Sequence, residues 1–306
     1  MDDGRRAADD WRRARGTFLA LFGPGSAWLA VFFTAPLALI WLYGFSESDR
    51  FGDPTLVPTA ENYERAFEWV HLAIAAKSAR IAAEVTAISV LIGFPVALGI
   101  AFAPARWKTP LLVLVMLPFW TNLLIRTYAW IAVLRTRGYL NGALEYLHAR
   151  ATVVADALGL PGLFGAFAPL NLLYQESAVI VALVHLHLPF LVLPLYAVLD
   201  RMDRSLIEAS LDLGASQWLT FRAVIVPTAM PGLVTGALLV FILCLGNFVV
   251  PDLLGGTDAI MLGNLIAQQF GAARDWPFGA VLSLLLLYAT FLALWLRARL
   301  ARGRAA

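Results

Sequence analysis

The sequence predicts an all-α, polytopic membrane protein with six transmembrane helices. Hydrophobic residues make up 60% of the 306 residues and charged residues only 14%, whereas soluble proteins average about 45–50% and about 25%. The apolar residues gather into runs of about 20 residues, the length that an α-helix needs to cross the hydrocarbon core. This composition leaves little room for a separate soluble catalytic domain.

Each apolar run is predicted to form one membrane-spanning helix. The first run follows an Arg-rich start but has no small-residue cleavage site before a soluble domain, so we interpret it as an uncleaved span and not as a signal peptide. Prolines inside the runs are expected to allow kinks. The six runs are Ala27–Tyr43, Ile81–Ala103, Pro110–Leu134, Ala178–Leu199, Gly232–Val250 and Gly279–Leu296.

Basic residues near the ends of the runs predict the orientation, because Lys and Arg are enriched on the cytoplasmic side. Five arginines precede the first run, and four follow the last. Arg106 and Lys108 follow the second run. Both termini are therefore predicted to be cytoplasmic, with residues 1–25 forming a basic tail. Some basic residues also flank runs on the external side, where we expect Glu84 to pair with Arg80.

Two long connections, 46–77 and 135–175, lie on the external side in this topology. The second contains an amphipathic pattern at Asn141–His148, which predicts a short helix. Neither connection has the character of a folded domain. The single cysteine, Cys244, lies inside an apolar run, so the sequence predicts no disulfide framework, no metal site and no cofactor.

A polar stretch, Glu208–Pro227, separates the fourth run from the fifth, and the parity of the spans places it in the cytoplasm. Ser205 lies three residues before Glu208, which is the spacing of a capping box. Gly214 fits a helix C-terminus, where positive φ is required. The pattern predicts a short helix that begins at Ser205 and ends before a bend at Ala215.

A second short helix is predicted to begin at Ser216 and to run toward Pro227, with Trp218, Phe221 and Ile225 on one face. Two functions fit such a helix pair. It can be a rigid lever on which a cytoplasmic partner pushes, or an interfacial connection whose aromatic side chains rest among the lipid headgroups. The residue pattern alone leaves both interpretations open.

The stretch "EASLDLGASQWLTFRAVIVP" resembles the cytoplasmic signature of bacterial ATP-binding-cassette importer permeases. Ser210 replaces an alanine of that signature, and the matching residues are Glu208, Ala209, Gly214, Val224, Val226 and Pro227. The resemblance implies a type I importer permease with a MetI-like fold over residues 26–306. It also implies that helices within 203–227 couple to an ATPase subunit.

The same resemblance implies the partners and the location. A second homologous permease, two ATPase subunits and an external solute-binding protein are expected, in a bacterial inner membrane, with no role for nucleic acid. Energy is expected to come from another chain, because the sequence has no G-x-x-x-x-G-K-[ST] phosphate cradle. No motif of a membrane hydrolase is present either, so the chain is not expected to be an enzyme.

Three further stretches resemble permeases of spermidine/putrescine uptake systems: "LPFWTNLLIRTYAW", "LPFLVLPLYAVLDRMDRSLIEASLDLGA" and "NFVVPDLLGGTDAIMLGNLI". The resemblance implies a polyamine as the solute. One departure is Asn247, which stands where a glutamate is expected between Gly246 and Phe248. Another amine, an amino-acid derivative or a different organic solute therefore stays open. An ion-coupled secondary transporter is the rival class, but it normally carries buried acidic residues near the midplane.

Polar and aromatic residues inside the runs are candidates for the translocation path. Arg126 is costly at membrane depth and is expected to face a cavity or an interhelical partner. Asn122 and Asn247 can bind solute or join helices, and Trp120 and Tyr128 can offer ring faces to an ammonium group or rest at the interface. His185 and His187 point in different directions on a helix, so we interpret them as interhelical hydrogen-bonding residues and not as a metal pair.

Overall fold

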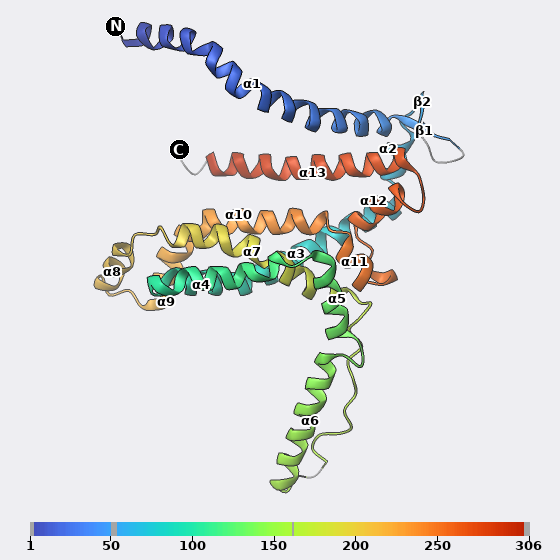
Figure 1. Ribbon diagram of the computed structural model, residues 1–306. Helices are drawn as coiled ribbons and strands as arrows, with labels where there is room; N and C mark the ends of the chain where they lie inside the picture. The colour runs from blue at the N-terminus through green and yellow to red at the C-terminus, as the bar shows by residue number, and fades with distance from the viewer. Residues whose placement is uncertain (1–2, 50–53, 161, 303–306) are drawn as a thin grey trace. The chain divides into compact units, whose positions relative to one another are not determined.

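The computed structural model describes residues 3–49, 54–160 and 162–302, and these are mostly helical (Figure 1). Five helices are long and apolar enough to cross a membrane, and a bent pair makes six if it counts as one span. The predicted all-α class is confirmed. The one sheet in the described residues is an antiparallel hairpin of β1 (Ser46–Ser48) and β2 (Pro54–Pro58), which the sequence did not predict.

The chain divides into two compact units. One unit holds the residues before 69 together with those from 268 onward, and the other holds residues 69–267. In the first unit α1 packs along α13. The helices of this unit are α1 (Asp3–Gly44), α2 (Glu61–Ala66) and α13 (Trp276–Arg302).

Arg65 ties α2 to the start of α13 in the first unit. Its Nη1 donates to Asp275 Oδ2 at 3.0 Å, and its guanidinium carbon lies 4.3 Å from the centre of the Phe278 ring. Asn62, on the same short helix, donates to the backbone carbonyl of Ser46 at 2.9 Å. These contacts hold the hairpin, α2 and α13 together.

The helix α1 begins well before the predicted first span and runs without interruption past residue 26. The part of it that is long and apolar enough to contain a membrane span is Arg15–Gly44. Most of the basic side chains that predict the orientation lie outside the described side chains: Arg5, Arg6, Arg12, Arg13, Arg302 and Arg304. The cytoplasmic placement of both termini therefore stays a prediction.

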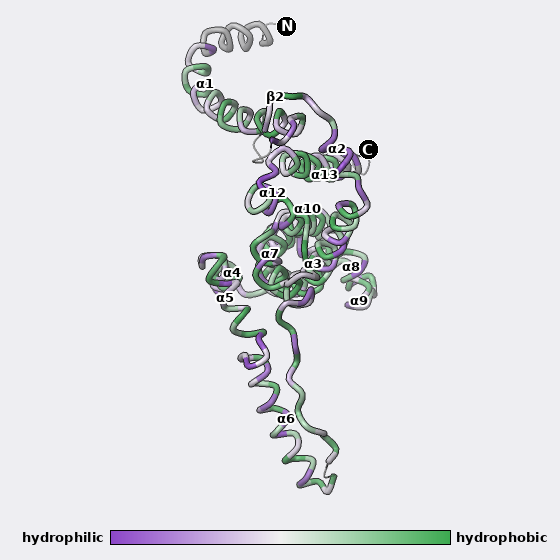
Figure 2. The backbone as a smooth tube through the Cα atoms, turned by 90° about the vertical axis from the view of Figure 1, so that its right-hand side faces the viewer, coloured by the Kyte–Doolittle hydropathy of each residue, from purple (hydrophilic) through white to green (hydrophobic). Residues whose placement is uncertain are grey.

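The second unit is built around α7, which packs against both α3 and α10. The share of buried residues is 61% in the span of α7, against 33% in α3 and 28% in Gln217–Leu245, so α7 is the central helix. Figure 2 shows hydrophobic residues along all three helices, whereas α6 also carries hydrophilic ones. The helices are α3 (Trp69–Phe102), α7 (Glu176–Leu199), α10 (Val226–Leu245) and α6 (Tyr139–Ala157).

The backbones of α7 and α10 approach closely where α10 carries Gly232 and Gly236. A Cβ atom on Gly236 would lie 2.9 Å from both Cα and O of Leu191, and one on Gly232 would lie 2.8 Å from the carbonyl oxygen of Pro194. Glycines four residues apart let transmembrane helices pack backbone against backbone. The contact therefore excludes any side chain at these two positions.

The predicted third span, Pro110–Leu134, is not one helix. It consists of α4 (Ala105–Met116), the 3-10 turn η1 (Leu117–Trp120) and α5 (Leu123–Leu134), with a bend of 91° between the two arms. Thr121 and Asn122 are extended, with ψ of 149° and 141°. Pro118 favours the break because it has no N–H to donate to the helix.

Other ends also differ from the predicted ones. The helix predicted at Asn141–His148 is longer, and Asn141 within it exchanges two hydrogen bonds with the backbone of Leu170. The fifth span ends at Leu245 and not at Val250, and short helices follow it. They are α11 (Val249–Leu254), η3 (Thr257–Ala259) and α12 (Leu262–Phe270).

Ion pairs fix both ends of α7. At its start Arg80 of α3 donates to Glu176 at 2.6 Å and to Glu84 at 2.8 Å, which confirms the predicted pairing of Arg80 with Glu84. At its end Lys108 of α4 donates to Asp200 at 2.5 Å. The hydrogen bond from Lys108 holds the pKa of the Asp200 carboxyl below its ordinary value.

The helix contact predicts that Gly236→Ala destabilises the protein by about 1–3 kcal/mol, because the new methyl group overpacks against the backbone of Leu191. Gly99→Ala in α3 is the matched control, since no atom lies within 4 Å of its added Cβ. Thermal unfolding of the detergent-solubilised protein measures both. An unchanged unfolding midpoint in Gly236→Ala would show that the two backbones are not in contact.

Candidate functional site

A cleft of about 330 Å³ opens in the second unit between α5, the middle of α7 and the C-terminal end of α10. Its α7 wall includes Leu186 and His187, which lie halfway along the 24 residues of that helix. The cleft is therefore near the middle of the predicted membrane span. The lining residues are Phe119, Leu123, Arg126, Leu186, His187, Phe190, Leu243, Gly246, Asn247, Phe248 and Val249.

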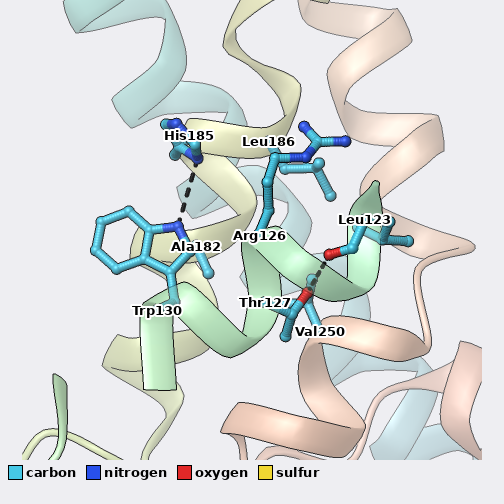
Figure 3. Close-up of a pocket in the computed structure, with 8 residues that line it drawn as sticks. All are labelled: Leu123, Arg126, Thr127, Trp130, Ala182, His185, Leu186 and Val250. Carbon is cyan, nitrogen blue, oxygen red and sulfur yellow. Dashed lines mark hydrogen bonds between the residues drawn. The ribbon is translucent and has the colours of Figure 1, made fainter. Parts of the chain in front are cut away.

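Arg126 is the one charged residue among the described residues that line this cleft. Its Nε is buried and has no hydrogen-bond partner. Its guanidinium carbon lies 6.0 Å from the centre of the Phe119 ring, and Figure 3 shows the guanidinium directed away from His185 and Trp130. The expectation that Arg126 faces a cavity is thus consistent with the structure.

Trp130 and His185 join α5 to α7 beside Arg126. The indole Nε1 donates to His185 Nδ1 at 3.4 Å, and the two rings meet edge to face with centroids 5.6 Å apart (Figure 3). The interhelical hydrogen bond predicted for His185 is confirmed. His187 is buried and its Nδ1 has no hydrogen-bond partner among the described residues, so the corresponding bond of His187 stays a prediction.

The two asparagines of the predicted path bind backbone groups close to them in sequence. Asn122 is the N-cap of α5, and its Oδ1 accepts from Leu124 N at 2.8 Å. Asn247 lines the cleft, and its Oδ1 accepts from Val250 N at 3.1 Å in the first turn of α11. Each asparagine oxygen therefore accepts from the first turn of the helix that follows a break, and the described hydrogen bonds of these two side chains do not join separate membrane spans.

The structure brings only two of the five predicted path residues into the cleft, Arg126 and Asn247. Asn122, Trp120 and Tyr128 are not among the cleft's lining residues, and the two aromatic side chains are 73% and 57% exposed. The aromatic residues that do line it are phenylalanines. Phe119 and Phe190 meet edge to face, with centroids 5.5 Å apart.

Phe119 and Phe190 each follow a Leu-Pro pair in the sequence. The triplet Leu-Pro-Phe occurs at 117–119 and again at 188–190. In each case the proline interrupts hydrogen bonding within its own helical segment, and the following phenylalanine lies in the cleft.

The predicted helix pair between α7 and α10 is present, and it begins with α8 (Ser205–Asp212) and α9 (Gln217–Thr220). Gly214 has a φ of +83°, as predicted. Its N–H donates to Leu211 O at 2.9 Å, and the next N–H, of Ala215, donates to Ser210 O at 3.2 Å. This hydrogen-bond pattern is a Schellman motif, which requires a left-handed residue at the position of Gly214.

The start of α8 differs from the predicted capping box. Asp203, and not Ser205, supplies the acceptor, because its Oδ1 accepts from Ser205 N at 2.9 Å. This bond lowers the pKa of the Asp203 carboxyl. Glu208 is exposed and makes no hydrogen bond or ion pair within the described residues. The side chain of Glu208 is therefore free to meet a partner.

The second helix begins at Ser216 as predicted, since Ser216 Oγ accepts from Leu219 N at 3.2 Å. It does not end at Pro227. The chain passes through a π-helical turn, η2 (Phe221–Ile225), directly into α10. Pro227 lies in the first turn of α10, where its missing N–H costs little.

Three contacts attach this segment to the rest of the unit. Ser210 and Thr220 share a hydrogen bond of 2.9 Å, which joins α8 to α9. The Phe221 ring meets Phe94 of α3 edge to face at 5.7 Å. Arg204 lies over Phe102, 5.4 Å from the ring centre, at the end of α3. The helix pair is thus fixed to α3 as well as to α7 and α10.

Residues 85–305 match the model of the family described as binding-protein-dependent transport system inner membrane component. The match includes the cleft and the helix pair. The chain belongs to this family. It is a permease of the ATP-binding-cassette importer class, and permeases of this class work with an ATPase and a solute-binding protein.

Curated relatives agree with this assignment. The chain is 38% identical over 259 residues to the spermidine/putrescine transport system permease protein PotB of Escherichia coli (strain K12). This alignment covers 85% of the chain and 88% of the relative. It is 37% identical over 258 residues to PotB of Haemophilus influenzae, covering 84% and 85%. It is also 32% identical over 283 residues to the inner membrane ABC transporter permease protein YdcU of E. coli, covering 91% and 88%.

A solved structure with low sequence identity has the same fold. A chain of the bacterial alginate ABC transporter, in complex with alginate pentasaccharide-bound periplasmic protein, matches with a TM-score of 0.69 and 14% identity, covering 96% of each chain. At this identity the likeness establishes the fold alone. The predicted importer-permease fold is confirmed.

The conformation of Gly214 gives a second prediction. Gly214→Val should loosen the helix pair by about 1–2 kcal/mol, because a side chain opposes a φ of +83°. Gly214→Asn should have a smaller effect, since asparagine tolerates this region. Hydrogen exchange over residues 205–220 is the measurement. Equal exchange rates in both variants and the parent protein would contradict the Schellman geometry.

Proposed function

We propose that this chain is one of two permease subunits of an ATP-driven importer for a polyamine such as spermidine or putrescine. The observation that carries the proposal is the 38% identity over 85% of the chain to spermidine/putrescine permeases. Identity of this extent covers both the cleft and the helix pair, and so includes the segments that handle solute and energy.

The cleft is the proposed part of the solute path. Its phenylalanines can offer ring faces to ammonium groups, and cation–π attraction strengthens when water is excluded. Asn247 adds an amide at the same wall. Trp120 and Tyr128, which do not line this cleft, remain proposed path residues on the assumption that a second permease completes the passage.

The helix pair within 203–227 is the proposed coupling segment, with Glu208, Ala209, Gly214, Val224 and Pro227 as its principal residues. Its outer surface is both apolar and charged. Leu213 and Trp218 are 89% and 70% exposed, and Glu208 is exposed on α8. Large exposed apolar side chains around a charge are typical of a docking surface. We assign this surface to the ATPase subunit.

The proposed assembly contains this chain, a second homologous permease, two ATPase subunits and a solute-binding protein on the external side. It lies in a bacterial inner membrane, with both termini and the helix pair in the cytoplasm. Residues 1–25 then form a basic cytoplasmic tail, and residues 26–306 form the membrane domain. The basic residues at the ends of the spans support this orientation.

An ion-coupled secondary transporter is less well supported. Such proteins bind their coupling ion through acidic residues near the midplane, and none of the described residues that line the cleft is acidic. Glu84, an acidic residue of α3, is paired with Arg80 near the start of the second unit. The lack of an acidic residue among the described cleft residues therefore favours ATP hydrolysis by a separate subunit, and not ion coupling, as the energy source.

The proposal predicts that Glu208→Gln inserts at normal levels but weakens association with the ATPase subunit by about tenfold or more. The reason is that loss of one partner of an interfacial charge pair leaves the other charge unpaired. Local stability should not change, because Glu208 makes no capping bond in α8. Co-purification of the ATPase and ATP-dependent spermidine uptake measure the two effects.

Asp212→Asn is the matched control for this experiment. Asp212 is exposed on the same helix, and its replacement by asparagine removes the same charge. Asp212 is not one of the residues that match the permease signature. It should leave association near the parent level. Normal association and normal coupled uptake in Glu208→Gln would remove Glu208 from the docking contact.

A further inference from the structure

Arg126 has no counter-charge among the residues that the structure describes. The cleft that it lines lies beside the middle of α7, a helix long and apolar enough to cross a membrane. An arginine at that depth pairs with another group or faces a water-filled cavity. None of the described lining residues is acidic, and the Nε of Arg126 is buried without a hydrogen bond.

The other described residues do not supply the missing acid at this depth. The spans Arg15–Gly44 and Trp276–Arg299 of the first unit contain no aspartate or glutamate. In the second unit, Glu84 and Glu176 pair with Arg80, and Asp200 pairs with Lys108. Asp252, on α11, is exposed and does not line the cleft.

The C-terminal end of α10 offers a weaker compensation. Leu243 and Gly246 lie in the cleft wall, so the negative end of the α10 helix dipole lies near Arg126. A helix end carries only about half an elementary charge. The helix end therefore compensates part of the charge of Arg126 but does not replace a full counter-ion.

The surroundings of Arg126 indicate that protein covers this face. Ile125 and Tyr128, on the same helix, are 66% and 57% exposed, and Phe119 and Phe248 at the cleft are 42% and 48% exposed. Apolar side chains can face lipid, but an arginine among them cannot do so cheaply. If the solute is a polyamine, it is also positive and cannot be the counter-ion.

We propose that Arg126 pairs with a carboxylate of the second permease subunit, so that the cleft is closed by the partner and the arginine's charge is neutralised where the polycation passes. This inference rests on the proposed function, since it uses the positive charge of the solute. It assigns the α5 face around Arg126 to the interface between the two permeases.

The test uses the full importer complex with three variants of this position. Arg126→Lys keeps the charge and should co-purify with the second permease within about threefold of the parent. Arg126→Gln should lower co-purification by about tenfold or more, and Arg126→Glu should lower it further, because two carboxylates then face each other. Normal membrane levels of this chain in each variant exclude a folding defect.

Suppressor selection identifies the partner group. Starting from Arg126→Glu, restored assembly should come from replacing an aspartate or glutamate of the second permease by lysine or arginine. Asp252→Asn is the control for an acid within this chain, and it should assemble normally. The double exchange Lys108→Asp with Asp200→Lys is the control for the method, since this pair lies within one chain.

Three outcomes overturn the inference. They are unchanged assembly in both Arg126→Gln and Arg126→Glu, suppressors that fall in this chain, and a defect of Asp252→Asn equal to that of Arg126→Gln. Normal assembly of Arg126→Gln together with lost uptake of an anionic solute would place the counter-charge on the solute. Spermidine binding to the solute-binding protein is measured separately, so that a wrong solute is recognised independently of the assembly result.

Discussion

The contact between α7 and α10 is the constraint on which the rest of the second unit depends. Gly232 and Gly236 bring the two backbones together over Leu191–Leu195, so these helices can move only as a pair. The helix pair of 203–227 joins the end of α7 to the start of α10. The cleft lies at the middle of α7 and at the far end of α10. A push on the proposed coupling segment would therefore reach the cleft through two helices in close contact.

Breaks in the helices place the polar groups of the cleft. The interruption at Thr121–Asn122 turns α5 by 91° from the preceding arm, and Asn122 satisfies the new helix start. Asn247 does the same after α10. Irregular backbone at membrane depth is tolerated where it is buried in protein or lines a cavity. Both breaks lie next to the cleft residues, which is consistent with a path and not with a simple lipid-facing surface.

The sequence was sufficient for the helical class, the approximate spans and the bend at Gly214, because apolar runs and left-handed glycines leave direct signals. It was not sufficient for the broken third span, since Thr121 and Asn122 are only two polar residues within a long apolar run, too short an interruption to separate two helices by hydropathy. The capping box failed for a related reason. Asp203 lies only two residues before Ser205, and its carboxylate takes the Ser205 N–H that the side chain of Glu208 was expected to satisfy.

The cleft could be predicted only in part. Arg126 and Asn247 stand out as polar residues in apolar runs, but the phenylalanines that surround them are common in membrane helices and carry no signal individually. Trp120 and Tyr128 were predicted from residue type, but they are exposed and do not line this cleft. Which residues of α5, α7 and α10 meet depends on the bend at Asn122 and on the α7–α10 contact, and neither is encoded in local periodicity.

Solute uptake into proteoliposomes distinguishes ATP-driven import of a polyamine from ion-coupled transport. The complex of this chain with its second permease and ATPase subunits is reconstituted, and labelled spermidine is supplied with the solute-binding protein outside. We expect uptake to require both ATP and the binding protein. Uptake should stop when ATP is replaced by a non-hydrolysable analogue. Uptake driven by a proton or sodium gradient without the ATPase subunits would contradict this expectation.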